Sequence, residues 1–352
     1  MVRAIHPYCL SSFLAFRYVV DPAAEWVPGI KPEYPEVAAQ GQIPVETMEE
    51  IEGQLRAIIA RKLSPTTGIL LSGGIDSAIL AALLPRGTRA YTIRFNAARF
   101  LDESIQARVY AERLGLRHSV VAVDWADYAA FAPALMVRKK APLHAIEVAL
   151  HKAARAARAD GLDALIVGNG ADSTFGGMDK LLARDWTLEE FYDRYTFVDP
   201  FRALRDPVDL RSVYRPYLKA DGLIDVQRFL KTVHGLGIIQ SFENAIRSVG
   251  LSLLEPFEQL RYVRPLDLAR IRAGESKYLL KALFRRLFAG MEPPEKIPFA
   301  RPMDTWLADW RGPGRPEFKS GVDWGAFGGD QRWLLHSLGE FLDLLDAGKL
   351  DG

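Results

Sequence analysis

The sequence predicts an α/β fold in which a parallel sheet carries helices on both faces and is followed by a mainly helical C-terminal region. Between residues 46 and 180, short apolar segments with the length of strands alternate with longer segments of helical period. The short segments are continuously apolar, which is typical of strands covered on both faces. Beyond about Met178 the strand signal fades and the apolar residues recur at helical spacing. We therefore expect an N-terminal arm over residues 1–45, an α/β domain over 46–180 and a mainly helical domain over 181–352.

The first 45 residues are rich in proline and aromatic side chains and are predicted to form an extended arm. Their apolar stretch YCLSSFLAFRYVV, residues 8–20, is interrupted by Arg17 and lacks a basic lead-in, so we interpret it as a core strand or helix and not as a signal peptide. Thr47 and Glu50 have the spacing of a capping box and predict the start of a helix. The apolar stripe of this helix consists of Ile51, Leu55, Ile58 and Ile59.

The elements that follow are predicted from hydrophobic period alone. The predicted strands are residues 67–74, 89–95, 118–124 and 163–168. The predicted helices of the α/β domain are residues 76–84, 103–115 and 145–161. The helical segments of the C-terminal region are residues 241–254, 277–288 and 331–346, the last preceded by a loop rich in glycine and proline at 311–321.

Composition limits the classes of partner. Hydrophobic residues make up 49% and charged residues 25% of 352 residues, as in folded water-soluble proteins. The net charge of +1 gives no general attraction to nucleic acid or to a membrane, so we expect a small-molecule ligand and leave the oligomeric state open. No uncharged apolar run reaches the ~18 residues of a membrane span. Cys9 is the single cysteine, which excludes a disulfide within the chain and predicts a cytoplasmic location.

A glycine-rich turn, SGGIDS at residues 72–77, stands between a predicted strand and a predicted helix. Glycine lets the backbone approach an anion closely, and the N–H groups at the start of a helix favour negative charge. An aspartate beside a phosphate is repulsive unless a divalent cation lies between them, so the motif implies Mg²⁺. The turn is not a P-loop, because no Gly-Lys-Ser/Thr follows the glycines. An ordinary turn capped by the aspartate is the alternative to a site for the pyrophosphate end of ATP. The residues predicted to bind ATP here are Ser72, Gly73, Gly74, Asp76 and Ser77.

A second motif narrows the possibilities. VGNGADSTFGG, residues 167–177, resembles the Ser-Gly-Glu-Gly-Ala-Asp-Glu-Leu-Phe-Gly-Gly signature of asparagine synthetases, and SGGIDS resembles the pyrophosphate-binding loop (PP-loop) of the ATP pyrophosphatases. Further similar segments follow in the family's order: TIRF with DESIQARVYAERLGLRHSVV, ENAIRSVGLSLLEPFE, SKYLLKALFRR and KIPFARPMDTWL. The arm up to Pro35 resembles the linker that precedes the synthetase domain. The chain is thus similar to the asparagine synthetase superfamily over nearly its whole length, which implies a fold like that of the adenine nucleotide alpha hydrolases.

The resemblance implies a role for each matched residue. Asp76 and Asp172 match the two carboxylates that hold Mg²⁺ on the pyrophosphate. Lys277 matches a lysine that stabilises the oxyanion formed when an amine attacks an acyl-adenylate, and a fixed cation facing developing charge is a major source of rate enhancement. Lys296 matches a lysine that contacts phosphate oxygens. The other positions that the resemblance places around the nucleotide are Leu71, Ile93, Gly168 and Gly170.

Two departures from the family pattern bear on the chemistry. Val2 and not a cysteine follows Met1, so we expect no glutaminase activity. The nitrogen would then come from free ammonia, a separate glutaminase subunit or an amine on the substrate. Asn169 stands at the second position of the signature's Gly-Glu-Gly, and asparagine cannot act as a general base near neutral pH. Either another group, such as the outgoing phosphate, Glu147 or Glu103, takes the proton of the attacking amine, or the nucleophile is a different one. The identity of the acid stays open.

The resemblance predicts an ATP-dependent carboxylate–amine ligase that forms an acyl-adenylate and passes the acyl group to ammonia or an amine. Its ligands would be ATP, Mg²⁺ and a small carboxylic acid. Three alternatives remain open: a relative that closes an amide within one molecule, as β-lactam synthetases do; a tRNA-modifying ATP pyrophosphatase; and a non-catalytic nucleotide-binding protein. The joint presence of Asp76, Asp172 and Lys277 argues against the non-catalytic alternative. The candidate catalytic residues are Lys277, Asn169 and Lys296, and the candidate metal ligands are Asp76 and Asp172.

Overall fold

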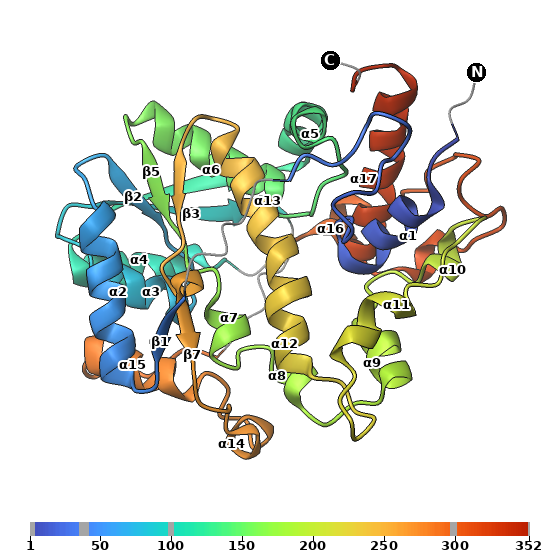
Figure 1. Cartoon of the computed structure of the whole chain (residues 1–352). Coiled ribbons are helices and arrows are strands. Elements are labelled where there is room, and N and C mark those ends of the chain that lie inside the picture. Colours follow the sequence, from blue (N-terminus) through green and yellow to red (C-terminus); the bar gives the residue numbers. More distant parts are fainter. Residues whose placement is uncertain (1–3, 35–41, 98–101, 296–300, 351–352) are drawn as a thin grey trace.

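A five-stranded parallel sheet forms the centre of the computed structural model, which describes residues 4–34, 42–97, 102–295 and 301–350 (Figure 1). The strand order is β4-β3-β2-β5-β6. The strands are β2 (Thr67–Leu70), β3 (Arg89–Phe95), β4 (Arg117–Val123), β5 (Ala164–Ile166) and β6 (Ser252–Leu254). The predicted α/β class with a parallel sheet is confirmed.

The order of the strands reverses beside β2. Ile69 of β2 pairs with Ala90 of β3 on one side and with Ile166 of β5 on the other. The chain therefore runs outward from β2 to β4 and then returns to the opposite side of β2. In open parallel sheets such a reversal separates the two neighbouring loops at the carboxyl ends of the strands and leaves a crevice between them. The loops after β2 and β5 are the two motifs that the sequence singles out.

One face of the sheet is covered by helices that share an apolar cluster with β2. These helices are α2 (Met48–Lys62), α3 (Ile75–Ala82), α4 (Ser104–Leu114) and α15 (Tyr278–Leu287). The start of α2 is the predicted capping box, in which the backbone N–H of Glu50 donates to Thr47 Oγ1 at 3.2 Å. α15 belongs to the C-terminal region, so both halves of the chain cover this face.

The opposite face is covered by α5 (Trp125–Lys139), α6 (Glu147–Ala159) and α13 (Gly235–Arg247). α6 turns Ala154 and Ala157 toward Tyr91 of β3 in a shared cluster. Side chains as small as alanine let the helix approach the sheet closely. α13 packs along α6 and also contacts β6, so the two helices lie side by side on this face of the sheet.

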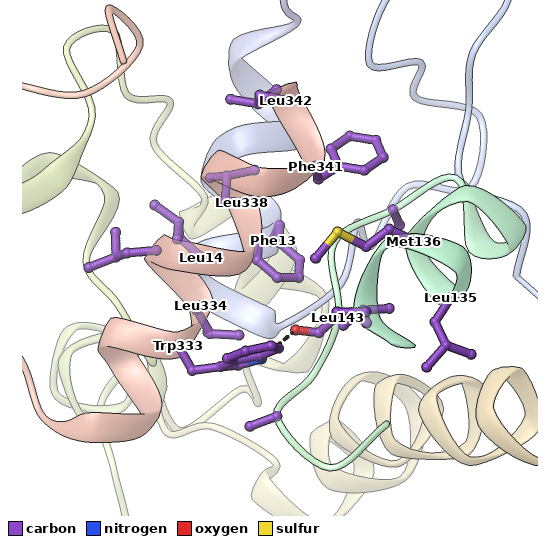
Figure 2. Packing of buried hydrophobic residues seen from close by; sticks show 14 of the residues in the cluster. Phe13, Leu14, Leu135, Met136, Leu143, Trp333, Leu334, Leu338, Phe341 and Leu342 are labelled. Carbon is purple, nitrogen blue, oxygen red and sulfur yellow. Dashed lines mark hydrogen bonds between the residues drawn. The ribbon is translucent and has the colours of Figure 1, made fainter. Parts of the chain in front are cut away.

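The helical part at the right of Figure 1 joins the two ends of the chain. α1 (Pro7–Phe16) packs beside α17 (Gly329–Asp346), and both contact α5 through one apolar cluster. Figure 2 shows this cluster, with Trp333 Nε1 donating to the carbonyl oxygen of Leu143 at 2.9 Å. The apolar segment near the N-terminus was predicted as either a core strand or a core helix, and it is a core helix. The prediction of an extended arm is wrong for residues 7–16, because their apolar side chains need a buried partner and find it in α17.

One element after residue 180 differs from its prediction. Residues 241–254 are predicted as helical, but α13 ends at Arg247 and Ser252–Leu254 form strand β6. Gly250, with φ of +77°, lies in the turn between them. The leucines of this segment continue the helical spacing of the apolar residues before them, and only its pairing with β5 defines the strand.

The remaining elements are short. β1 (Ile43–Val45) and β7 (Leu260–Tyr262) form a separate parallel pair. The other helical segments are α7 (Ala171–Thr174), α8 (Asp179–Leu182), α9 (Leu188–Tyr195), α10 (Pro200–Ala203), α11 (Arg211–Tyr214), η1 (Arg215–Tyr217), α12 (Val226–Phe229), η2 (Leu230–His234), η3 (Phe257–Gln259), α14 (Leu268–Arg272), α16 (Met303–Trp306) and η4 (Trp324–Ala326). In the part of the chain that the structure describes, no helix combines the length and the apolar character needed to cross a bilayer.

Candidate active site

A cavity of about 360 Å³ opens where the loops after β2 and β5 meet. Many of the predicted site residues line it: Leu71, Ser72, Asp76, Ser77, Ile93, Gly168, Asn169, Gly170 and Asp172. Gly73 and Gly74 belong to the same loop as Ser72 but do not line the cavity. Lys296 lies outside the described residues.

The glycine-rich turn leads directly into α3. Gly74 is the N-cap residue of this helix, and no side chain caps it. The turn is held by its serines, because the N–H of Ser72 donates to Ser77 Oγ at 2.9 Å and the N–H of Gly74 donates to Ser72 Oγ at 3.2 Å. A helix start without a side-chain cap can offer its N–H groups to an anion. Asp76 lies in the first turn of the helix and is not its cap, so the capping role that the alternative gave to Asp76 is wrong.

Lys277 joins the two motifs. Its Nζ lies 2.5 Å from Asp76 Oδ2, in the loop after β2, and 2.8 Å from Asp172 Oδ1, in the loop after β5. The lysine side chain is only 6% exposed. Burial disfavours the charged ammonium, but the two carboxylates outweigh it and raise the pKa of Lys277 above its usual value. Lys277 does not itself line the cavity; it is a buried cation held by two carboxylates that do, and its raised pKa keeps it from acting as a base.

Two backbone features fix this arrangement. Lys277 has φ of +53°, in the left-handed region, at the N-cap of α15. A residue other than glycine in that region costs of order 1–3 kcal/mol and persists where its surroundings hold it, as the two carboxylates do here. Gly177 closes the second motif, and a Cβ at this position would overlap with Asp172 Oδ1 and Lys277 Cε. Any larger residue at 177 would push the lysine and the aspartate apart.

The two aspartates fit the predicted Mg²⁺ site in chemistry and in position. Mg²⁺ is commonly held by one or two carboxylates together with oxygens of the substrate's phosphates. Asp76 and Asp172 line the same cavity and converge on one cation, Lys277. No cluster of three or more potential ligands of the His, Cys, Asp and Glu types occurs among the described residues. The carboxylates would thus bind Mg²⁺ jointly with a nucleotide and not as a metal site made of protein alone.

One wall of the cavity is apolar and belongs to the sheet. Leu71 and Ile93 lie at the ends of β2 and β3, and Thr92 Oγ1 donates to the carbonyl oxygen of Leu71 at 2.6 Å. This hydrogen bond ties the two neighbouring strands together, while Gly168 lies against Asp76 and Ser77 at the start of α3. Ile146 and Leu150 continue the wall from the side of α6. An apolar wall next to the glycine-rich turn suits the adenosine group that the sequence predicts here.

The far wall comes from the helical region and was missed by sequence reasoning. His234 lies at the end of η2, a π-helix, which is a form often found at functional sites. Arg17 Nη2 and Tyr195 OH each lie 3.0 Å from His234 Nδ1. Because an arginine can only donate, Nδ1 accepts and the proton of the neutral imidazole is on Nε2. The rest of this wall is Met178, Gly235, Ile238, Phe242 and Arg301.

Comparison with known proteins decides the family. The asparagine synthase family model matches residues 50–232, more than half of the 352 residues. The chain belongs to the asparagine synthase family. Membership supports an ATP-using, synthetase-type enzyme. The matched segment contains both glycine motifs and ends before Lys277.

The individual proteins that this chain resembles share 30% or less of its residues over the matched regions. The amidase chry2 of Gibberella zeae is 30% identical over a region that covers 38% of this chain, and the chain spans only 22% of that protein's length. Among solved structures, an NMN synthetase from Francisella tularensis is 16% identical with a TM-score of 0.27, covering 71% of this chain and 97% of the other. A U34-tRNA thiolase, NcsA, from Methanococcus maripaludis is 16% identical with a TM-score of 0.27, covering 72% and 83%.

The signature position that departs from the asparagine synthases has a carboxyl group beside it. Asn169 Nδ2 donates to Glu255 Oε1 at 2.8 Å. Three residues further on, Glu258 lines the cavity. Burial raises the pKa of Glu255 to about 8 and that of Glu258 to about 7. Sequence reasoning missed both glutamates, although they stand in LLEPFE, within a segment that it matched to the family.

The two carboxyl groups that the sequence analysis suggested as acceptors of the amine's proton do not lie beside Asn169. Glu147 is fully buried away from the cavity, where it accepts from Lys139 Nζ, from the N–H of His144 and from Asn244 Nδ2, each at 2.7 Å. Its oxygens are therefore occupied, and the suggestion that Glu147 takes the amine's proton is wrong. Glu103 does line the cavity, but it lies against Gly73, on the side of the glycine-rich turn.

Proposed function

We propose that this protein is an ATP-dependent carboxylate–amine ligase. It adenylates a carboxylic acid with release of pyrophosphate, and transfers the acyl group to ammonia or an amine with release of AMP. The observation that supports this reaction best is the convergence of Asp76 and Asp172, from two neighbouring strand ends, on Lys277 at the edge of one cavity. Carboxylates fixed at these positions can hold a cation on the phosphates, and a fixed ammonium can stabilise the negative charge that develops on the acyl oxygen.

In this proposal the nucleotide lies across the carboxyl edge of the sheet. The glycine-rich turn and the start of α3 bind the pyrophosphate end, and the apolar wall of Leu71 and Ile93 contacts the adenosine. Asp76 and Asp172 would hold Mg²⁺, which supplies neutralisation of the phosphate charge when it is bound. Lys296 stays a predicted phosphate contact.

Lys277 acts after adenylation. Its ammonium is held in place by two carboxylates and a left-handed backbone before any substrate arrives. A preorganised cation needs no rearrangement when the carbonyl oxygen of the acyl-adenylate becomes an oxyanion. Asn169 and the far wall around His234 face the acid and the amine.

Exchange of labelled pyrophosphate into ATP tests the adenylation step. A panel of carboxylic acids is expected to contain at least one that provokes exchange, and Asp76→Asn and Asp172→Asn are expected to lower that exchange at least 100-fold. Asp206→Asn serves as the matched control, because Asp206 pairs with Arg205 on the exposed surface.

Absence of exchange with every acid would contradict the ligase and favour a nucleotide-binding protein without catalysis. Amide formation without any added ammonia or amine would assign the reaction to the intramolecular class. Binding of tRNA that weakens steeply with salt would favour a tRNA-modifying enzyme.

A further inference from the structure

We propose that Glu258 is the group that accepts the proton of the attacking amine, and that Glu255, through its hydrogen bond to Asn169, positions the segment that carries it. This inference rests on the proposed ligase function. It assigns a residue to the transfer of the amine's proton, the step left open because Asn169 replaces the glutamate of the family signature. Glu258 would be a catalytic residue, and Glu255 a positioning residue.

The sheet brings the two segments together. β5 and β6 are parallel neighbours with Ile166 paired to Leu254, so the chain leaves both strands at the same edge. Asn169 follows one strand and Glu255 the other, and their side chains meet at 2.8 Å. The position that would bear a glutamate in the family signature is therefore in direct contact with the segment that supplies new carboxyl groups.

Gly170 allows that segment to come close. It has φ of +89°, and a Cβ at this position would lie 2.8 Å from both the backbone nitrogen and the Cδ of Glu258. The backbone of the Glu258 turn is also held from the other side, because Gln42 Nε2 donates to the carbonyl oxygen of Glu258 at 3.0 Å. The carboxyl group is thus packed directly against the signature loop.

The other carboxyl groups that line the cavity are engaged elsewhere. Asp76 and Asp172 are ion-paired with Lys277, and Glu103 lies against the glycine-rich turn where the phosphates would bind. Among the described residues, Glu258 is the remaining acidic group that lines the cavity. It lies on the side of Asn169, where the acyl group would face the amine.

The charges around this pair are of both signs. Burial raises the pKa of Glu258, and the positive charge of Lys231 on η2 lowers it in part. Burial is also the main cause of the raised pKa of Glu255. The charges of Glu258 and Glu243 raise that pKa further, and the charge of Arg247 lowers it. A carboxyl group that titrates near neutral pH is partly ionised and is matched to the task of a general base.

The step balances without a further reactant. The lone pair of the amine forms a C–N bond with the acyl carbon, and the π electrons of the carbonyl move to its oxygen, beside Lys277. One N–H proton of the amine passes to the Glu258 carboxylate. The tetrahedral intermediate then collapses, the C–O bond to the phosphate breaks, and AMP leaves with the electron pair.

The test separates the two half-reactions in Glu258→Gln, using the acid that gives the strongest pyrophosphate exchange. Exchange is expected to stay within about threefold of the unsubstituted protein. Amide formation from ammonia at a fixed concentration of free base is expected to fall by about 10²–10⁴-fold, the usual contribution of a general base. Hydroxylamine, a stronger nucleophile, should still trap the acyl group as a hydroxamate. Glu292→Gln is the matched control, because Glu292 is exposed and paired with Arg285.

Two further measurements distinguish catalysis from structure. The unsubstituted protein should show an increase in amide formation with an apparent pKa near 7, and Glu258→Gln should lose this increase, whereas Glu258→Asp, which keeps the carboxyl group, should retain part of it. Unchanged amide formation in Glu258→Gln, or loss of exchange together with amide formation in both variants, would overturn the inference while leaving the ligase in place. Absence of exchange in the unsubstituted protein would overturn the ligase itself and this inference with it.

Discussion

At the level of single residues, Lys277 connects the two glycine motifs by pairing with one aspartate from each. It is 201 positions from Asp76 in the sequence, yet the two groups form one ion pair. The arrangement places one positive charge between two negative ones in a largely buried setting. Removing the lysine would leave two carboxylates facing each other, and like charges at such a distance repel strongly.

Lys277→Met is therefore expected to lower amide formation by at least 100-fold, because the fixed cation facing the oxyanion is lost. It should also lower the melting temperature in the absence of metal. Added Mg²⁺ should then raise the melting temperature of the variant more than that of the unsubstituted protein, since the freed carboxylates can bind the ion.

Thermal unfolding with and without Mg²⁺ measures this second effect. Lys219→Met, which removes an exposed lysine paired with Asp221 at 3.0 Å, controls for loss of positive charge alone. An equal response to Mg²⁺ in the Lys277 variant and the unsubstituted protein would show that the two aspartates do not form a cation site.

At the scale of the element, the buried ion pair between Lys139 and Glu147 connects the end of α5 to the start of α6. The side chains are 1% and 0% exposed, and their charged atoms lie 2.7 Å apart. Glu147 also holds the N–H of His144 and the amide of Asn244 on α13. One carboxylate thus fixes three helices behind the apolar wall of the cavity.

Lys139→Met is expected to reduce the free energy of unfolding by about 3–5 kcal/mol, because it leaves a buried carboxylate without its counter-ion. Lys152→Met is the matched control: Lys152 lies on α6 and pairs with Asp127, but its side chain is 31% exposed, so a loss of about 1 kcal/mol or less is expected. Urea denaturation followed by circular dichroism measures both values, and equal losses would contradict the role given to the buried pair.

At the scale of the whole molecule, segments distant in the sequence complete each layer. The sheet takes its edge strand β6 from beyond residue 250, and α15 covers one face from beyond residue 277. The cluster in Figure 2 joins α1, α5 and α17, so the two ends of the chain pack on the central domain together. A predicted boundary at residue 180 divides these layers.

A fragment of residues 46–180 is therefore expected not to unfold cooperatively, because it lacks β6, α13 and α15 and would expose both apolar faces of the sheet. Denaturation of the fragment and of the full chain, each followed by fluorescence and by circular dichroism, measures this. A single sharp transition in the fragment with both probes would show that it is an independent domain.

Much of the fold could be predicted from local pattern. The strand over residues 89–95, the capping box at Thr47 and the glycine-rich turn between β2 and α3 each depend on residues close together in the sequence. Strand β6 could not be predicted, because its leucines continue the apolar spacing of α13 and only the pairing with β5 distinguishes it from helix. The left-handed start of α15 at Lys277 could not be predicted either, because two distant carboxylates hold it.

Local pattern was enough to predict the class of fold and to single out the two motifs, since apolar period, glycine turns and the acids at residues 76 and 172 are local properties. The three-dimensional arrangement was needed to show that these acids share Lys277, that the first helix packs on the last, and that Glu255 and Glu258 lie beside Asn169. The physical reason is that parallel strands bring their carboxyl ends to one edge whatever their separation along the chain, so the contacts of the site depend on strand order and not on spacing in the sequence.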